Sequence, residues 1–508
     1  MSLAILVSRA IYGFQAQPVR VEVHVGPGLP AFIIVGLPDA GVKESRERVR
    51  SALLSSGYEF PAGRITVNLA PADLPKDSGR FDLAIALGIL LATGQVVAGQ
   101  RNNAVLEIAD RVFVGELSLT GALGTIKGAL AIAMAVARES PGTCLIMPAA
   151  SAGAAAQVPG IIVQSAATLA EVVDDLAGRK PMPCAQPAPS EPRSMGEYCL
   201  SDVCGQEAGR RALEIAASGQ HSLLMHGPPG VGKSMLAQRL PGLLPPLSTL
   251  QSLEVAALQG LAGHDAVPGP FPPFRAPHHT ASTPAVIGGG AWPRPGEISL
   301  AHHGVLFLDE IPEFHRPVLE SLREPLETGV VSIARARLSC TFPARFQLVA
   351  AMNPCPCGWA GHPRKTCSCP PARVEAYRRR LSGPLLDRID LHVGLGPPDG
   401  AWFDAAGGET SETVQSRVMA CRGRQLARQG CTNAQLNGGD LRQHAVPDTA
   451  GAKLLRDAGE RWDWSVRVVH RVLRIARTLA DMSHSDRIRT AHVAEALQFR
   501  PVWEMRSH

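Results

Sequence analysis

The stretch "HGPPGVGKS", residues 226–234, decides the fold of the region around it. It matches the pattern G-x-x-x-x-G-K-[ST], and it lies between the apolar segment "SLLM" and the helix-like segment "SMLAQRL". A strand, a glycine-rich loop and a helix in this order form a phosphate-binding loop, because backbone N–H groups close around phosphates at the helix N-terminus. The residues predicted to hold ATP are Gly227, Pro228, Pro229, Gly230, Val231, Gly232, Lys233 and Ser234.

Two carboxylates are predicted to complete this nucleotide site. The segment "GVLFLDEIPEF" is an apolar strand that ends in Asp309 and Glu310. Such a strand delivers its last residues to the carboxyl edge of the sheet, beside the phosphate loop. We predict that Lys233 reaches the β- and γ-phosphates and that Ser234 and Asp309 hold Mg²⁺. Glu310 then orients the attacking water, which makes ATP hydrolysis the expected reaction.

The composition is that of a globular protein with several domains. The chain has 508 residues, 45% of them hydrophobic, and a formal charge of +5, which permits nucleic acid as a partner without requiring it. The start of the chain has no basic segment before its short apolar run, and 11 cysteines without an export signal favour the cytoplasm. The longest apolar stretch, residues 81–99, contains Asp82 and three glycines, so we expect a buried helix rather than a membrane span.

The pattern of apolar segments predicts an α/β protein with three domains. Strand-like and helix-like segments alternate over residues 1–177, and residues 178–195 are proline-rich and suit a linker. Alternation resumes over residues 196–395 with short buried strands, which predicts a parallel sheet. Residues 396–508 are predicted to be helical.

Two further polar residues follow strands or helices of the central region. The segment "FQLVAAMNP" places Asn353 after a buried strand, where it can sense the γ-phosphate, and "LSGPLLDRIDLHV" places Arg388 after a helix. This order resembles AAA+ ATPases, in which such an arginine enters the neighbouring subunit's site, so the resemblance implies an oligomer. The alternative is a surface arginine paired with Asp387 or Asp390.

The C-terminal region resembles the helical lid of AAA+ ATPases. A helix is predicted over residues 465–482, and Arg467 occupies the place of the second sensor in such lids. Arg471 and Arg474 are read as a solvated basic face of the same helix. Gln206, in "DVCGQEAGRRALEIAA", is expected near the adenine base. The apolar stripe of the helix comprises Val468, Val472, Ile475, Leu479 and Met482.

Several uncommon segments occur in the order found in the ComM/YifB family of magnesium-chelatase-like ATPases. They include "PFRAPHH", "PRPGEISLAHHGVLFLDEIPEF", "AAMNPCPCGWAGHP" and "SGPLLDRIDLHV". The resemblance implies a cytoplasmic, homo-hexameric motor that acts with recombination proteins in DNA branch migration, homologous recombination and natural transformation. Two alternatives stay open: the motor subunit of a magnesium or cobalt chelatase, and a Lon-like protein unfoldase.

Two predicted hairpins offer contacts to DNA. The segment "VVSIARARLSCTFPARF" carries Arg335 and Arg337 near its turn, and "GGGAWPRPGEI" carries Trp292 and Arg294. In related hexameric helicases a hairpin at this point of the chain projects into the central pore. Cations with an aromatic ring suit a single-stranded or branched DNA backbone without reading its sequence. The alternative is a pair of ordinary surface hairpins.

The N-terminal region resembles the proteolytic domain of Lon proteases, which has the ribosomal S5 domain 2-like fold. Segments 70–90 and 115–133 carry the resemblance, and Lys127 takes the place of the catalytic lysine of that family. The position of the serine nucleophile is Arg80, although Ser78 lies two residues earlier. An arginine cannot act as that nucleophile. We therefore expect the protease fold without protease activity.

Two C-x-C pairs lie in an insertion over residues 355–369. Cys355, Cys357, Cys367 and Cys369 offer four thiolates, enough for one tetrahedral Zn²⁺, with His362 as a spare ligand. The alternative is four free thiols in a loop. Since the segment lies between Asn353 and Arg388, the prediction is a structural clip rather than a DNA-reading finger.

Overall fold

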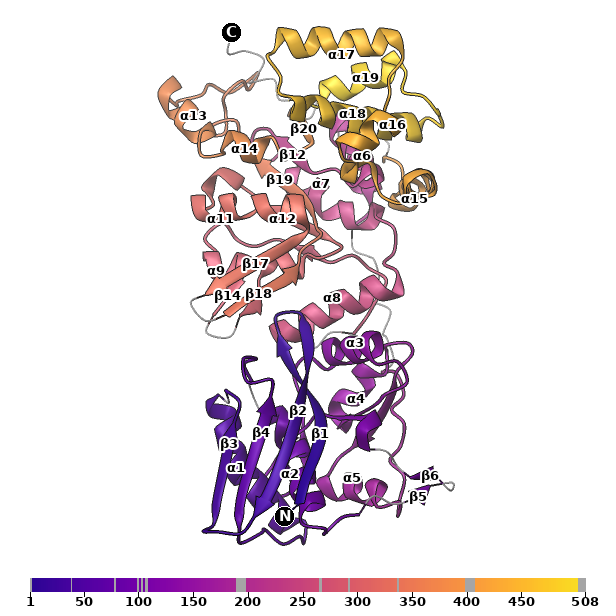
Figure 1. Ribbon diagram of the computed structural model, residues 1–508. Helices are drawn as coiled ribbons and strands as arrows, with labels where there is room; N and C mark the ends of the chain where they lie inside the picture. Colours follow the sequence, from indigo (N-terminus) through magenta and orange to yellow (C-terminus); the bar gives the residue numbers. More distant parts are fainter. Residues whose placement is uncertain are drawn as a thin grey trace. The chain divides into compact units, whose positions relative to one another are not determined.

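The structure is a computed structural model (Figure 1). It describes residues 2–37, 39–76, 79–97, 100–101, 104–105, 108–188, 198–264, 267–290, 293–335, 338–397 and 407–500. The chain forms two compact units, which we describe separately. Unit 1 comprises residues 1–192, 249–269 and 334–341, and unit 2 comprises residues 193–248, 270–333 and 342–508.

Unit 1 is built on a mixed seven-stranded sheet with the order β11-β10-β7-β1-β2-β4-β3. The long hairpin β1–β2 is antiparallel, whereas β3–β4 and β10–β11 are parallel pairs. The strands are β1 (Ser2–Tyr12), β2 (Gln15–Gly26), β3 (Ala31–Val35), β4 (Arg64–Ala70), β7 (Arg111–Phe113), β10 (Cys144–Pro148) and β11 (Ile162–Ala166). The helices of its N-terminal segment are α1 (Ala40–Ser55), α2 (Asp82–Ala92), α3 (Ala129–Glu139), α4 (Ala149–Ala155) and α5 (Leu169–Leu176).

The apolar stretch near residue 90 is the buried helix α2, as predicted. Nearly all of its side chains are buried in the core of unit 1, and at its N-terminus the buried Asp82 carboxylate accepts from Arg48 Nε at 2.7 Å. Burial of this apolar helix against β1 and β2 stabilises the unit through the hydrophobic effect. Within the described residues, no helix combines the length and the apolar character that crossing a membrane requires.

Two segments of the chain group with unit 1 beyond the predicted N-terminal domain. Within the predicted linker, residues 183–185 lie along the edge strand β11, where Ala185 N donates to Val163 O at 2.8 Å. Helix α8 (Thr249–Ala262) packs on α3, and its Leu253, Ala256 and Ala257 are buried in the same apolar cluster. The domain boundaries predicted after residues 177, 195 and 395 stay predictions, because each of the two units is made of separate segments of the chain.

Unit 2 contains the predicted parallel sheet, with the strand order β13-β16-β19-β12-β20. All of its pairings are parallel. The strands are β13 (Phe274–Arg275), β16 (Val305–Leu308), β19 (Gln347–Met352), β12 (Leu223–His226) and β20 (Leu391–Gly394). The helices before the C-terminal group are α6 (Glu207–Gly219), α7 (Lys233–Arg239), α9 (Thr283–Ile287), α10 (Glu297–Leu300), α11 (Arg316–Ser321), α12 (Arg323–Thr328), α13 (Pro371–Arg378) and α14 (Gly383–Leu386). The carboxyl ends of these parallel strands meet at one edge, where ligands bind in such sheets.

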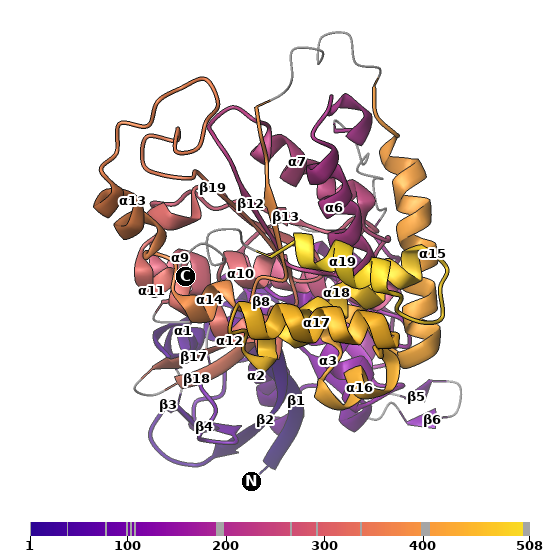
Figure 2. The same cartoon turned by 90° about the horizontal axis from the view of Figure 1, so that it is seen from above.

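The C-terminal region of unit 2 is helical, as predicted, and Figure 2 shows its helices grouped together. Four residues of the predicted stripe on α18 are buried. Met482 packs against the core cluster that contains Val472, Ile475 and Leu479. A helix with an apolar stripe of this spacing packs that side inward. The helices are α15 (Ser411–Gln429), α16 (Gly438–His444), α17 (Thr449–Arg461), α18 (Val466–Met482) and α19 (Thr490–Gln498).

Candidate active site

The phosphate loop, the two carboxylates and Asn353 line one cavity of about 340 Å³ in unit 2, which we call the phosphate-loop cavity. The loop follows β12, the carboxylates follow β16 and Asn353 follows β19, and these three strands are neighbours in the sheet. Parallel pairing therefore brings together residues that are far apart in the sequence. The lining residues are Pro229, Gly230, Gly232, Lys233, Ser234, Met235, Asp309, Glu310, Met352 and Asn353.

Two glycines of the phosphate loop have backbone conformations of the left-handed region. Gly230 and Gly232 have φ angles of +80° and +92°, which side-chain-bearing residues rarely adopt. Lys233 begins α7, and its Nζ donates to Gly227 O at 2.7 Å, to Pro228 O at 2.8 Å and to Asn353 Oδ1 at 3.1 Å. Burial lowers the pKa of Lys233 in this state. Phosphate oxygens would offer this ammonium group a charged partner and favour its protonated form.

Ser234 and Asp309 form a pair suited to Mg²⁺. The Ser234 hydroxyl donates to Asp309 Oδ2 at 2.7 Å, so the oxygens of α7 and β16 already converge. A hydroxyl and a carboxylate beside a phosphate loop fit a hard cation that keeps part of its water shell. When bound, Mg²⁺ would neutralise charge on the β- and γ-phosphates.

Glu310 is exposed and held in an unusual conformation. Its φ is +51°, in the left-handed region, and its backbone N–H donates to Asp309 Oδ1 at 2.9 Å. Such strain at a non-glycine residue is often found where a side chain must be aimed at a reacting group. His279 Nδ1 lies 3.6 Å from Glu310 Oε2. We did not predict a role for His279 from the sequence, where it appears only within the family-like segment "PFRAPHH".

Gln206 lies beside the phosphate loop, next to Val231. Its Nε2 donates to Val231 O at 3.1 Å and to Gly396 O at 2.8 Å. The side chain thus links the segment before α6 to the loop and to the segment after β20. This position is compatible with its predicted place near the base.

A second cavity of unit 2, of about 640 Å³, contains Arg388 and Arg467. Neither of these arginines lines the phosphate-loop cavity of the same chain. We call this second space the arginine cavity. Its charged lining residues are Arg345, Arg388, Arg467, Arg471, Arg474, Glu327 and Asp390.

Arg388 is held by Glu327 rather than by the partners predicted for a surface arginine. Its guanidinium lies 2.5 Å from Glu327 Oε1, and Nη1 donates to Pro384 O at 2.6 Å. The expected alternative pairing with Asp387 or Asp390 is wrong. The Asp390 carboxylate pairs with His221 and Arg471. The turn after α14 directs Arg388 toward Glu327 of α12 instead.

Asp390 anchors the segment after Arg388 to the C-terminal helices. Its carboxylate contacts His221 Nδ1 at 3.2 Å and accepts from Arg471 Nη1 at 3.1 Å. Burial alone would raise the pKa of Asp390, but the His221 hydrogen bond and the charges of His221, Arg471 and Arg474 hold it well below its usual value. Arg474 donates to Leu436 O, at 2.9 Å from Nε. From the sequence, Arg471 and Arg474 are interpreted as a solvated basic face. That interpretation is wrong, because both guanidinium groups are hydrogen-bonded within unit 2.

The residues proposed for DNA contact are only partly described. Arg294 is exposed at the start of β15 (Arg294–Pro295), which pairs with β14 (Gly288–Gly289). Arg335 ends β17 (Val330–Arg335), which pairs with β18 (Leu338–Pro343). Arg337 and Trp292 lie outside the described residues.

The position of the serine in the Lon-like region is occupied by a buried cation. Arg80 is buried, its carbonyl accepts from Gly115 N at 2.9 Å, and Lys127 is exposed. Ser78 lies outside the described residues. A buried arginine at this position offers no nucleophile to the exposed lysine.

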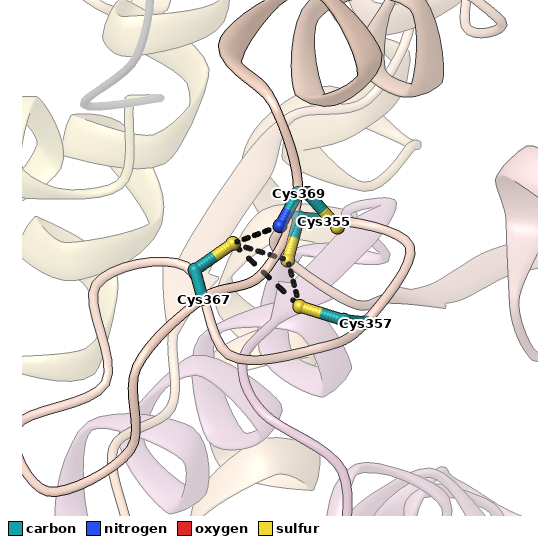
Figure 3. Close-up of side chains that lie close together, drawn as sticks. All are labelled: Cys355, Cys357, Cys367 and Cys369. Atoms are coloured by element: carbon teal, nitrogen blue, oxygen red, sulfur yellow. Dashed lines mark hydrogen bonds between the residues drawn. The ribbon is translucent and has the colours of Figure 1, made fainter.

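The four cysteines of the insertion converge in space (Figure 3). The Sγ atoms of Cys355 and Cys357 are 3.3 Å apart, and each lies 3.6 Å from that of Cys367. With Cys369, all four sulfurs lie within 4.8 Å of one another. His362 is not part of this group, because its Nδ1 accepts from the backbone N–H groups of residues 364 and 365.

Comparisons with known proteins match nearly the whole chain. Three family models match: "Subunit ChlI of Mg-chelatase" over residues 21–151, "Magnesium chelatase, subunit ChlI" over residues 199–400 and "Magnesium chelatase, subunit ChlI C-terminal" over residues 408–500. The protein YifB of Salmonella typhimurium is 46% identical, over 100% of this chain and 99% of its own. The competence protein ComM of Haemophilus influenzae is 45% identical over 98% of both chains. The magnesium-chelatase 67 kDa subunit of Heliobacterium mobile is 26% identical over 39% of this chain.

Proposed function

This chain belongs to the ComM/YifB family of magnesium-chelatase-like AAA+ proteins, and on that premise we propose that it is an ATP-hydrolysing ring motor that moves on DNA and drives branch migration. The processes it would serve are homologous recombination and natural transformation. One observation carries the proposal: the residues for ATP hydrolysis lie in one cavity, while Arg388 and Arg467 lie in another. We infer that a site divided in this way is completed between subunits, as in a ring.

In the proposed hydrolysis of ATP, each residue of the phosphate-loop cavity has one role. Lys233 exchanges its backbone acceptors for phosphate oxygens, and Asn353 contacts the γ-phosphate from the adjacent strand. Glu310 holds the attacking water and takes up its proton as the bond to phosphorus forms. Arg388 of one subunit then stabilises negative charge in the site of the next, an effect of about 10³- to 10⁵-fold where such arginines act.

The proposal of DNA as the substrate rests on three observations. A relative of this chain bears the name competence protein ComM. Arg294 is exposed on the β14–β15 pair, and Arg335 is the last residue of β17, which pairs with β18. Cationic hairpins suit backbone tracking on single-stranded or branched DNA, which needs no base-specific contacts.

The decisive experiment measures ATP hydrolysis with and without a four-way DNA junction, together with resolution of the junction into products. We expect DNA to stimulate hydrolysis and ATP to drive branch movement. The variant Glu310→Gln serves as the inactive control. If DNA does not change the rate of ATP hydrolysis and the intact protein moves no branch, the proposal of a DNA motor is wrong. The protein would then be an ATPase of another kind.

The family models favour one competing function, the motor subunit of a metal chelatase. Such a motor would need partner subunits and a tetrapyrrole acceptor for Mg²⁺ or Co²⁺. Stimulation of ATP hydrolysis by a chelatase partner, and none by DNA, would select it. A Lon-like activity would instead require peptide cleavage that depends on Ser78, and the buried Arg80 argues against it.

A further inference from the structure

We propose that Cys355, Cys357, Cys367 and Cys369 bind one Zn²⁺, and that this ion holds the loop 353–370 against the phosphate loop so that metal loading controls ATP binding. The metal site stands on the cysteine geometry alone. Its effect on the nucleotide rests on the function proposed above.

The sulfur positions fit a single tetrahedral ion. Zn²⁺ with Zn–S bonds of about 2.3 Å places its four thiolates about 3.8 Å apart. The measured Sγ separations of 3.3 and 3.6 Å, and the 4.8 Å limit for the whole set, are close to that value. A cluster of several irons would spread the thiolates further. Binding takes the four cysteines as thiolates, and their protons pass to the solvent.

Backbone N–H groups surround the sulfurs in the way thiolate ligands require. Ala360 N donates to Cys355 Sγ at 3.3 Å, and Cys369 N donates to Cys367 Sγ at 3.4 Å, the latter drawn in Figure 3. Such donors offset the negative charge that four thiolates leave on the site, and they orient the ligands. Cys355 is itself fully buried.

The loop has little else to hold it in place. Residues 353–370 join β19 to α13 without a helix or strand of their own, and only Cys355 and Gly358 among them are buried. Trp359 contacts the Lys365 ammonium, 3.8 Å above its ring, at the surface. Connections longer than about 12–15 residues without secondary structure are uncommon in ordered domains. A bound metal supplies the missing cross-link, as it does in small domains without a core.

The same loop contacts the phosphate loop directly. A Cβ atom on Gly358 would lie 2.6 Å from Pro229 Cδ, so the backbone of the loop 353–370 packs against this residue of the phosphate loop. Asn353, two residues before the first cysteine, accepts from Lys233. A metal that fixes the loop therefore fixes the position of Pro229 and of Asn353 together.

The first test measures zinc in the full-length protein by elemental analysis. We expect one zinc per chain, about none in the double variant Cys367→Ser/Cys369→Ser, and unchanged zinc in Cys184→Ser, which alters an exposed cysteine outside the cluster. Iron in place of zinc, no metal at all, or equal zinc in the double variant would overturn the site.

The second test separates the metal from its effect, because the cysteine variant can lose its local fold. Gly358→Ala adds a methyl group against Pro229, whereas Gly361→Ala adds one in open space at a similar φ, +76° against +83°. Both should retain zinc. We expect Gly358→Ala alone to weaken binding of a fluorescent ATP analogue without DNA, by about 2- to 30-fold, the range of coupling carried by packed contacts.

Equal nucleotide affinities in the two glycine variants would overturn the coupling. Because neither measurement contains DNA, failure of the DNA motor proposal would leave both results interpretable. The reverse also holds, since a DNA motor could bind ATP and move branches without any contribution from the cysteine cluster.

Discussion

The phosphate-loop cavity and the arginine cavity of unit 2 differ in the charged side chains that line them. The first contains Lys233 and the carboxylates of Asp309 and Glu310, and no arginine is found among its described lining residues. The second is lined by several arginines, among them Arg388 and Arg467. On the function proposed above, the first cavity positions the nucleotide, and the second presents an arginine to the site of another copy of the chain.

Removing Arg388 should produce the largest effect. We expect Arg388→Ala to slow ATP hydrolysis by about 10³-fold or more while ATP affinity of the isolated chain stays unchanged, because the arginine acts only on a neighbouring site. Steady-state hydrolysis and nucleotide binding measure the two quantities. Arg379→Ala, at an exposed guanidinium paired with Glu375, is the matched control.

Mixing two inactive variants sharpens the same prediction. Arg388→Ala and Lys233→Ala each lose activity, but an equal mixture would form about one quarter of its interfaces from two intact halves if the contact is head-to-tail. Activity should therefore return on mixing. A mixture as inactive as its components would contradict a contribution of Arg388 to the site of a neighbouring subunit.

Glu310→Gln should give the next largest effect, on the phosphate-loop side. The amide cannot accept the proton of the attacking water, so hydrolysis should fall by about 10²- to 10⁴-fold while ATP remains bound. Glu313→Gln, three residues further on and paired with Arg380, is the control. If both variants hydrolyse ATP alike, Glu310 is not the base.

Asp390→Asn should destabilise unit 2 rather than change its chemistry. Removing one charge from a buried pair costs about 3–5 kcal/mol, because Arg471 loses its counter-ion. The pKa of Asp390 is depressed in the folded state. Its stabilisation is therefore complete above the unfolded value of about 3.9 and is lost as the pH falls through the folded pKa.

Urea unfolding of both proteins as a function of pH checks this sign. The difference in unfolding free energy should be constant from neutral pH down to about pH 5 and should narrow below about pH 4. A difference that widens on acidification would show that Asp390 is not stabilised as a carboxylate.

Glu327→Gln should give the smallest effect, because Glu327 is half exposed and water screens its charge, although its partner Arg388 is nearly buried. We expect Arg388 to be freed and hydrolysis at low protein concentration to rise, by less than about fivefold. The gain should shrink in high salt, which screens the pair in the unmodified protein. Slower hydrolysis would mean that Glu327 positions Arg388 rather than restrains it.

The residues of the phosphate-loop cavity were predictable because each follows an apolar strand with a local pattern. The parallel sheet then places Lys233, Asp309 and Asn353 side by side without further information. The partners of Arg388 and Arg471 were not predictable in this way. Glu327 and Asp390 lie 61 and 81 residues from them along the chain, and no local pattern marks such a pair.

The two-unit grouping was also beyond sequence reasoning. Helix α8 follows the phosphate-loop helix in the sequence, and its apolar residues are equally suited to any core. Only the structure shows that Leu253 and Ala257 are buried with α3. Likewise, two closely spaced C-x-C pairs suggest a metal, but not that Gly358 lies against Pro229.

Helix α8 has a practical consequence for dissecting the protein. An ATPase fragment that begins after residue 192 would still carry this helix but would lack α3, and Leu253, Ala256 and Ala257 would face water. Exposed apolar patches of this kind promote aggregation. Simple truncation at the linker is therefore a poor route to a working motor fragment, and a shortened version would need those three positions made polar.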